Sequence, residues 1–275
     1  MKRNLDKTTV DSFGDEWERF DQSKLSAEET KQIFDQYFKI FPWDSLPNDA
    51  EGFDMGCGSG RWARVMADKV GHLNCIDPSN AIEVAKNSLA EFNNVSFYKK
   101  SVDEFSLEIG SQDFGYSLGV LHHVPDTGKA IQECSALLKP GAPFLVYLYY
   151  ALETQSILYK FLWKCSDYLR KIIFRLPPTL KHFVTDFLAI ILYFPLAKIA
   201  FLLEKFGISV NGFPLSFYRN CSFYTMRTDS RDRFGTPLEQ RFTQAQIKEL
   251  MLQAGFTNII FSDAEPKWCV VGIKS

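Results

Sequence analysis

Short apolar runs alternate with longer amphipathic stretches through the middle of the chain. The runs that predict buried strands cover residues 52–55, 72–76, 95–98, 114–118 and 144–148. The stretches that space apolar residues three and four positions apart, and so predict helices, cover 61–70, 81–92 and 127–138. Strands that alternate with helices in this way predict a parallel, doubly wound sheet of the α/β class.

Both ends of the chain extend this pattern. Ser26 and Glu29 have the spacing of a capping box, which predicts a helix from residue 26. After residue 242 we expect a helix over 243–254 and two last strands, the final one antiparallel. The predicted fold is a Rossmann-like, seven-stranded sheet with a helical lid inserted after strand five. Its expected parts are an N-terminal helical cap (1–50), a core (51–150), the lid (151–242) and the closing helix and strands (243–275).

The expected insertion differs in character from the rest of the chain, because it is rich in aromatic residues and partly basic. Its most apolar stretch, 187–197, contains Pro195 and is shorter than the about 20 residues that span a bilayer. We therefore expect the helices over 156–206 to form a packed lid or a dimer surface. Contact with a membrane surface is kept as the less favoured alternative.

Composition is that of a soluble globular enzyme. The net charge of −2 has no basic excess, which argues against a nucleic-acid partner. The six cysteines are scattered without metal-ligand spacing, so we expect free thiols, no bound metal and a cytoplasmic protein. The first residues carry no apolar signal segment.

The strongest chemical signal follows the first predicted strand. Three alternate glycines, Gly56, Gly58 and Gly60, lie between this strand and a helix. Glycines at such a turn let a ligand approach the backbone closely. Asp77 ends the next apolar run, where an acidic residue can accept hydrogen bonds from both hydroxyls of a ribose. The pair of signals predicts a nucleoside cofactor.

These motifs resemble those of the class I S-adenosylmethionine-dependent methyltransferases that act on small molecules. Asp54-Met55-Gly56-Cys57-Gly58-Ser59-Gly60 is similar to the family's first motif. Ser101-Val102-Asp103, the stretch from Asp113 to Asp126 and Leu137-Leu138-Lys139-Pro140-Gly141-Ala142 follow in the family's order, with Ala142 in place of a second glycine. The stretch from Phe13 to Trp17 resembles the N-terminal cap of small-molecule members.

The resemblance implies S-adenosylmethionine as cofactor and gives each matching residue a role. Asp54 and Gly56 would hold the methionine amino end, and Leu118 would offer its carbonyl to the same ammonium. Asp77 would bind the ribose, and Val102 and Asp103 the adenine. The full set of residues expected at the cofactor is Asp54, Gly56, Cys57, Gly58, Gly60, Asp77, Pro78, Val102, Asp103 and Leu118.

The acceptor side is predicted with less detail. His122 and His123 come just after strand four, where sheet folds bind ligands, so either is a candidate general base or a packed, capping side chain. Tyr147 and Tyr149 share one face of strand five, because alternate residues point the same way. The set expected at the acceptor is Trp17, Tyr147, Tyr149, Tyr218, Arg219 and Arg233.

The expected function is methyl transfer to oxygen or nitrogen of a small molecule, such as a natural-product, sugar or glycan-precursor metabolite. One alternative is methylation of a lipid or quinone head group at a membrane surface. Another is a regulatory subunit that binds the cofactor without catalysis. A homodimer is left open as a partner.

Overall fold

The computed structural model describes residues 3–104, 107–210, 212–264, 266 and 268–275. The chain forms two compact units, which we call the sheet unit and the helical unit. The sheet unit comprises 1–23, 30–151 and 238–275, and the helical unit comprises 24–29 and 152–237. The helical unit ends before residue 242 because Phe242 returns to the sheet unit, where its N–H donates to the Tyr149 carbonyl at 2.8 Å.

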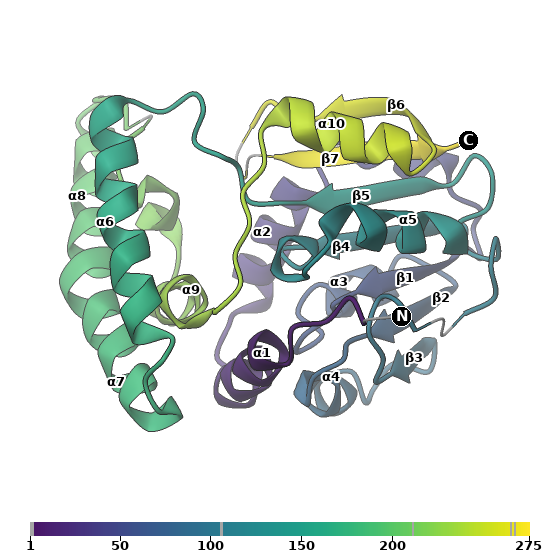
Figure 1. The fold of residues 1–275 in the computed structure, drawn as a ribbon, viewed down its shortest axis with the longest axis horizontal. Helices are drawn as coiled ribbons and strands as arrows, with labels where there is room; N and C mark the ends of the chain where they lie inside the picture. The colour runs from purple at the N-terminus through teal and green to yellow at the C-terminus, as the bar shows by residue number, and fades with distance from the viewer. Residues whose placement is uncertain (1–2, 105–106, 211, 265, 267) are drawn as a thin grey trace. The chain divides into compact units, whose positions relative to one another are not determined.

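The sheet unit contains a seven-stranded sheet in the order β3-β2-β1-β4-β5-β7-β6 (Figure 1). The strands are β1 (Glu51–Met55), β2 (His72–Ile76), β3 (Val95–Tyr98), β4 (Phe114–Leu118), β5 (Pro143–Tyr147), β6 (Phe256–Phe261) and β7 (Cys269–Lys274). The first five strands pair in parallel, and β7 pairs antiparallel with both β5 and β6. The predicted doubly wound fold and its antiparallel last strand are confirmed.

Helices cover both faces of this sheet. Apolar residues of α5 (Thr127–Leu137) and α10 (Gln244–Gln253) pack with Phe53, Phe144 and Phe256 on one face. Figure 1 shows these two helices lying over the same side of the strands. The other face is covered by α2 (Ala27–Tyr37), α3 (Ala63–Ala67) and α4 (Ala81–Ser88). Because helices cover both faces, the central strands β1, β2, β4 and β5 are buried along nearly their whole length rather than at alternate residues.

The N-terminal region holds one helix that the apolar pattern did not reveal. Helix α1 (Lys7–Arg19) begins after Asp6, whose carboxylate accepts a hydrogen bond from the Thr9 N–H at 2.8 Å. In the predicted capping box of α2, the Ser26 hydroxyl accepts from the Glu29 N–H at 3.1 Å. The Glu29 carboxylate also accepts from the Ser222 N–H and the Thr225 hydroxyl.

The helical unit consists mainly of four helices and shorter turns. The helices are α6 (Ile157–Ile173), α7 (Pro178–Leu188), α8 (Phe194–Lys205) and α9 (Phe223–Gly235). The shorter turns are the π-turn η3 (Ala189–Tyr193) and η4 (Ser216–Asn220). Its small apolar core is built from Ile173, Tyr193, Ala197, Met226 and Phe234. Helices α6 and α7 pack against α9, and α8 packs against η4.

Helices α7 and α8 join through η3 into one continuous helix, Pro178–Lys205, of 28 residues, and an 18-residue window within it has a mean hydropathy of 2.0. Within the described part of the chain it is the one helix long and apolar enough to cross a membrane. The prediction that the apolar stretch is too short was therefore wrong. Pro195 does not end the helix, because the π-turn just before it relaxes the hydrogen-bond ladder where proline lacks an N–H.

Candidate active site

The three alternate glycines form a tight loop at the carboxyl end of β1. All three have positive φ, of 82°, 52° and 80° for Gly56, Gly58 and Gly60. A Cβ at Gly56 would lie 2.4 Å from the Val120 side chain, so only glycine fits there. The N–H groups of Gly56 and Cys57 both donate to the Ile76 carbonyl, at 2.7 and 3.1 Å. The loop is therefore anchored to the end of β2, where Asp77 follows.

Asp77 is buried and is bonded to the glycine loop. Its Oδ2 accepts from the Gly58 N–H at 3.0 Å, and its Oδ1 accepts from both the N–H and the hydroxyl of Ser79, at 2.8 and 2.6 Å. Burial raises the pKa of Asp77, although these hydrogen bonds oppose the rise. Asp77 thus fixes the position of the loop as well as being a ligand candidate.

Asp54 is a buried carboxylate at the end of β1 that lacks a cationic partner. Its Oδ2 has no hydrogen-bond partner among the described residues. Burial raises the pKa of Asp54 to about 8; the Tyr116 hydroxyl opposes this rise, and the charge of Asp77 adds to it. A buried acid with an unsatisfied oxygen is a suitable binding site for an ammonium group, which would favour its ionised form.

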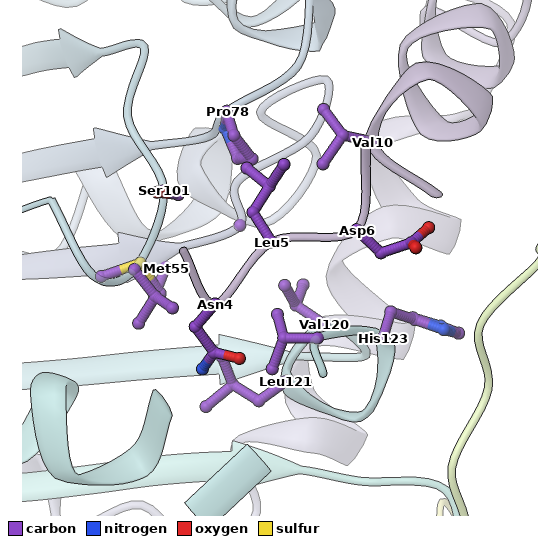
Figure 2. A pocket seen from close by; sticks show the side chains of 13 residues that line it. Asn4, Leu5, Asp6, Val10, Met55, Pro78, Ser101, Val120, Leu121 and His123 are labelled. Carbon is purple, nitrogen blue, oxygen red and sulfur yellow. The ribbon is translucent and has the colours of Figure 1, made fainter. Parts of the chain in front are cut away.

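A cavity of about 50 Å³ lies beside these residues. The expected cofactor residues Gly56, Pro78 and Val102 line it, together with Ser101 and residues of the N-terminal segment. Figure 2 shows the Leu5 side chain between Pro78 and Val120, in the middle of this region. A space of this volume holds water but not a nucleoside. Asn4, Leu5, Asp6 and Val10 line this cavity, so the N-terminal segment borders the region where the resemblance places the adenosine.

Asp103, expected to bind adenine, is engaged by the N-terminal segment. Its Oδ2 accepts from the Asn4 N–H at 2.8 Å, and its Oδ1 accepts from the Ser101 hydroxyl at 2.6 Å. Burial would raise the pKa of Asp103, but these hydrogen bonds lower it below its usual value. Asn4 also exchanges two hydrogen bonds with the backbone of Asp126. Asn4 and Leu5 were missed from the sequence, because no motif distinguishes them in a polar N-terminus.

His122 and His123 lie on the short 3₁₀ turn after β4, and both are buried. The Nδ1 of His123 lies 2.6 Å from the Leu238 carbonyl oxygen. Because a carbonyl only accepts, Nδ1 carries the proton and Nε2 carries the lone pair. Neither ring nitrogen of His122 has a hydrogen-bond partner among the described residues, and burial lowers the pKa of His122 well below its usual value.

Aromatic side chains surround the two histidines. The ring centroids of Tyr149 and His122 are 3.9 Å apart, and those of Phe13 and His123 are 5.0 Å apart. Tyr147 lies 5.9 Å from Tyr149, as expected for residues that share one face. Arg241 stacks on Tyr149 at 5.0 Å and pairs with Glu239, so it is already neutralised.

The remaining predicted residues are distributed over the two units. Trp17 lies against the glycine loop, with its indole nitrogen 3.0 Å from where a Cβ of Gly58 would be, so it is next to the expected cofactor. Cys57 and Leu118 are buried among apolar residues of the sheet unit, and burial raises the pKa of the Cys57 thiol well above its usual value.

The other three predicted acceptor residues belong to the helical unit. Arg219 pairs with Glu204 at 2.8 Å, and the ring of Tyr218 lies 5.1 Å from that of Tyr193. Arg233 donates to the Ser166 hydroxyl and stacks on Trp163. Each of these side chains has structural contacts within its own unit, so its role at an acceptor stays a prediction.

Comparison with known proteins identifies the sheet unit. Residues 53–146 match the family model described as a methyltransferase domain. A ubiquinone biosynthesis O-methyltransferase of Saccharophagus degradans is 38% identical over 91 residues, which are 32% of this chain and 39% of that protein. Phosphoethanolamine N-methyltransferase 2 of Caenorhabditis elegans is 35% identical over 101 residues, which are 35% of this chain and 23% of that protein. The chain thus spans about two fifths or less of the length of these two relatives.

A solved structure supports the same assignment at the level of the fold. A candidate methyltransferase from Bacillus halodurans C-125 superimposes with a TM-score of 0.52 at 12% identity, over 83% of this chain and 70% of that chain. Sequence match, strand order and glycine loop agree on residues 53–146. Residues 53–146 therefore match a methyltransferase domain, with the fold and glycine loop expected of the class I S-adenosylmethionine-dependent family.

Proposed function

We propose that this protein transfers the methyl group of S-adenosylmethionine to a hydroxyl oxygen of a small aromatic molecule. The observation that carries the proposal is His123, a buried imidazole whose Nδ1 proton is held by the Leu238 carbonyl. This arrangement leaves Nε2 as the basic nitrogen. A hydroxyl acceptor must lose a proton as it is methylated, and a positioned imidazole is suited to take it near neutral pH.

The residues around the glycine loop fit the cofactor. Asp54 offers an unsatisfied buried oxygen to the methionine ammonium, and Gly56 is required where a side chain would collide with Val120. Asp77 keeps lone pairs for the ribose hydroxyls. When bound, the cofactor supplies an activated methyl group on a sulfonium, so the protein need only position the acceptor and remove its proton.

The proposed step is an in-line substitution at the methyl carbon. The acceptor O–H gives its proton to Nε2 of His123, and an oxygen lone pair forms the new C–O bond. A bound S-adenosylmethionine would supply the methyl group and would retain the electrons of the broken C–S bond on its sulfur, as a neutral thioether. The rings of Tyr147, Tyr149 and Phe13 favour an aromatic acceptor. The names of the O-methyltransferase relatives support transfer to oxygen.

The proposal is tested with the purified full chain, S-adenosylmethionine and a panel of phenols, catechols, simple amines and phosphoethanolamine. Release of S-adenosylhomocysteine and the mass of the product are measured. We expect turnover with a phenol or catechol and none with amines. Methylation of phosphoethanolamine or another amine would instead assign an N-methyltransferase. Tight cofactor binding without turnover on the whole panel would favour the regulatory-subunit alternative.

The pKa of about 8 for Asp54 predicts that cofactor binding releases a proton. Below pH 8 this carboxyl is mostly protonated without ligand, whereas an adjacent ammonium favours the carboxylate and lowers the pKa. Affinity should therefore rise with pH up to about 8, by at most about tenfold per pH unit, and then level off. Calorimetry in two buffers of different ionisation enthalpy counts the protons.

The matched variant for this measurement is Asp54→Asn, which cannot ionise but has nearly the same volume. It should release one proton fewer than the wild type and bind more weakly at pH 8. Asp77 stays in place in both proteins, so its own ionisation cancels in the comparison. Equal proton release by the two proteins would exclude Asp54 as the partner of the ammonium.

A further inference from the structure

The helical unit exposes many large apolar side chains. On α7, Phe183 and Phe187 are 68% and 51% exposed, and on α6 Ile157 is 88% exposed. Exposed apolar residues continue along all three long helices: Leu158, Phe161, Leu162, Leu169, Ile172, Leu180, Ile190, Ile191, Phe194, Ile199, Phe201 and Leu202. Monomeric soluble proteins rarely expose so many large apolar side chains along neighbouring helices. We call this set of residues the apolar face.

The apolar face is the side of these helices that α9 and η4 do not cover. Along Pro178–Lys205 the buried positions are Lys181, Thr185, Ala189, Tyr193, Ala197 and Ala200, spaced at three or four residues. These pack within the helical unit, where α7 contacts α9 and α8 contacts η4. Figure 1 shows α6 to α9 clustered together. The side of the long helix that holds Phe183, Phe187 and Ile191 is therefore left without a partner inside its unit.

Positive charge accompanies this apolar surface. Residues 157–205 contain eight basic and three acidic side chains, in a chain whose net charge is −2. Lys164, Lys171, Arg175 and Lys198 are exposed among the apolar residues. The Lys198 ammonium lies over the rings of Phe194 and Phe201, at 5.5 and 6.0 Å. Lysines whose stems lie along apolar surface while their charge stays in water are suited to anionic lipid head groups.

The polar side of the long helix decides between crossing a bilayer and lying on it. Asp186 forms a two-pronged ion pair with Arg227 of α9, at 3.0 and 2.8 Å. The Ser230 hydroxyl donates to the Thr185 carbonyl at 2.8 Å. A spanning helix would carry this ion pair and the polar helix α9 into the hydrocarbon, at a high cost. A helix that lies in the interface keeps α9 in water.

We propose that the apolar face of α6, α7 and α8 binds the surface of a bilayer that contains anionic lipids, with the helices lying in the interface and not crossing it. The apolar side chains enter the boundary between head groups and acyl chains, and the lysines contact the head-group charges. The helical unit then holds the enzyme at a membrane. This inference does not depend on the proposed reaction.

The test is co-sedimentation of the purified full chain with vesicles of phosphatidylcholine, with and without phosphatidylglycerol. We expect binding to the mixed vesicles and weaker binding to phosphatidylcholine alone. The triple variant Phe183→Glu, Phe187→Glu, Ile191→Glu should bind at least about tenfold more weakly, because it places three charges on the apolar face. All three positions are exposed, so folding should survive, and circular dichroism verifies it.

A matched control keeps the number and kind of changes but moves them to the sheet unit. The variant Ile109→Glu, Leu252→Glu, Ile260→Glu changes three exposed residues and shifts the net charge by the same amount. It should bind vesicles like the wild type. The variant Lys164→Gln, Lys171→Gln, Lys198→Gln should lose the preference for anionic vesicles. Because vesicle binding is read without turnover, a failure here leaves the proposed reaction intact.

Three outcomes would overturn the proposal. Equal loss of binding in both triple glutamate variants would mean that net charge, not the apolar face, governs it. A protein that ignores vesicles and is a dimer by light scattering, but a monomer after the changes at Phe183, Phe187 and Ile191, would assign the face to a second copy. Sealed vesicles are treated with protease on both sides of the membrane. Cleavage of the chain before and after the long helix, with the helix itself protected, would show that it crosses the bilayer.

Discussion

Replacing His123 by alanine should lower kcat by about 10²–10⁴-fold, the usual contribution of a positioned general base. The Nδ1 of His123 lies 2.6 Å from the Leu238 carbonyl oxygen, which makes Nε2 the proposed base, and the substitution removes this nitrogen. Cofactor affinity should change little, because the glycine loop and Asp77 do not depend on this ring. Turnover under saturating acceptor and cofactor measures the effect.

The neighbouring histidine provides the matched control. His122 is fully buried and stacks on Tyr149 at 3.9 Å, and its pKa lies well below the usual value. His122→Ala should therefore lose about 1–3 kcal/mol of unfolding free energy, with a kcat within about tenfold of wild type. The reverse pattern would assign the base to His122. Turnover close to wild type in both variants would leave positioning alone as the mechanism.

Replacing Asp77 by alanine should weaken S-adenosylmethionine binding by about 10- to 150-fold, which corresponds to about 1.5–3 kcal/mol for hydrogen bonds to a charged group. Two causes act together. The ribose loses its acceptor, and the N–H of Gly58 and both donors of Ser79 lose theirs. Asp77→Asn keeps one acceptor oxygen and should lose less. Calorimetry on the folded variants gives the affinities.

Asp113→Ala is the control for a general effect of losing a carboxylate. Asp113 is at the start of β4, at the opposite end of the sheet from the glycine loop, where it pairs with Lys139 and accepts from the Glu51 N–H. This variant should lose stability but keep cofactor affinity. If it binds the cofactor as weakly as Asp77→Ala does, the assigned role of Asp77 is wrong.

The sequence by itself was enough for the sheet. Strands buried on both faces are apolar throughout, and this signal gave β2, β3 and β4 with their observed bounds. The loop after β1 was equally predictable, since Gly56 and Gly60 are required by positive φ and by contact with Val120 and Leu89. Local conformation and burial are recorded in the residue types themselves, so a pattern can reveal them.

Other features were decided only by tertiary structure. No local sequence pattern indicates that Asn4 binds Asp103 or that Leu5 lies beside Pro78. In both cases the two residues are far apart in the sequence, and only the folded chain brings them together. The choice between His122 and His123 rests on the Leu238 carbonyl, which lies more than 100 residues later in the chain, after the helical unit in the sequence. Pairings between distant segments follow from packing of the whole chain, and no residue pattern records them.

The long helix, Pro178–Lys205, also combines a property that the sequence predicts with others that only the tertiary structure decides. The apolar composition of residues 187–197 was visible, but its continuation through Pro195 into a helix of 28 residues was not. A π-turn accommodates the proline, and contacts with α9 and η4 decide which side stays exposed. Sequence determined how apolar this segment is. Only the tertiary structure determined that its phenylalanines face outward, because one side of the helix is already occupied by polar α9.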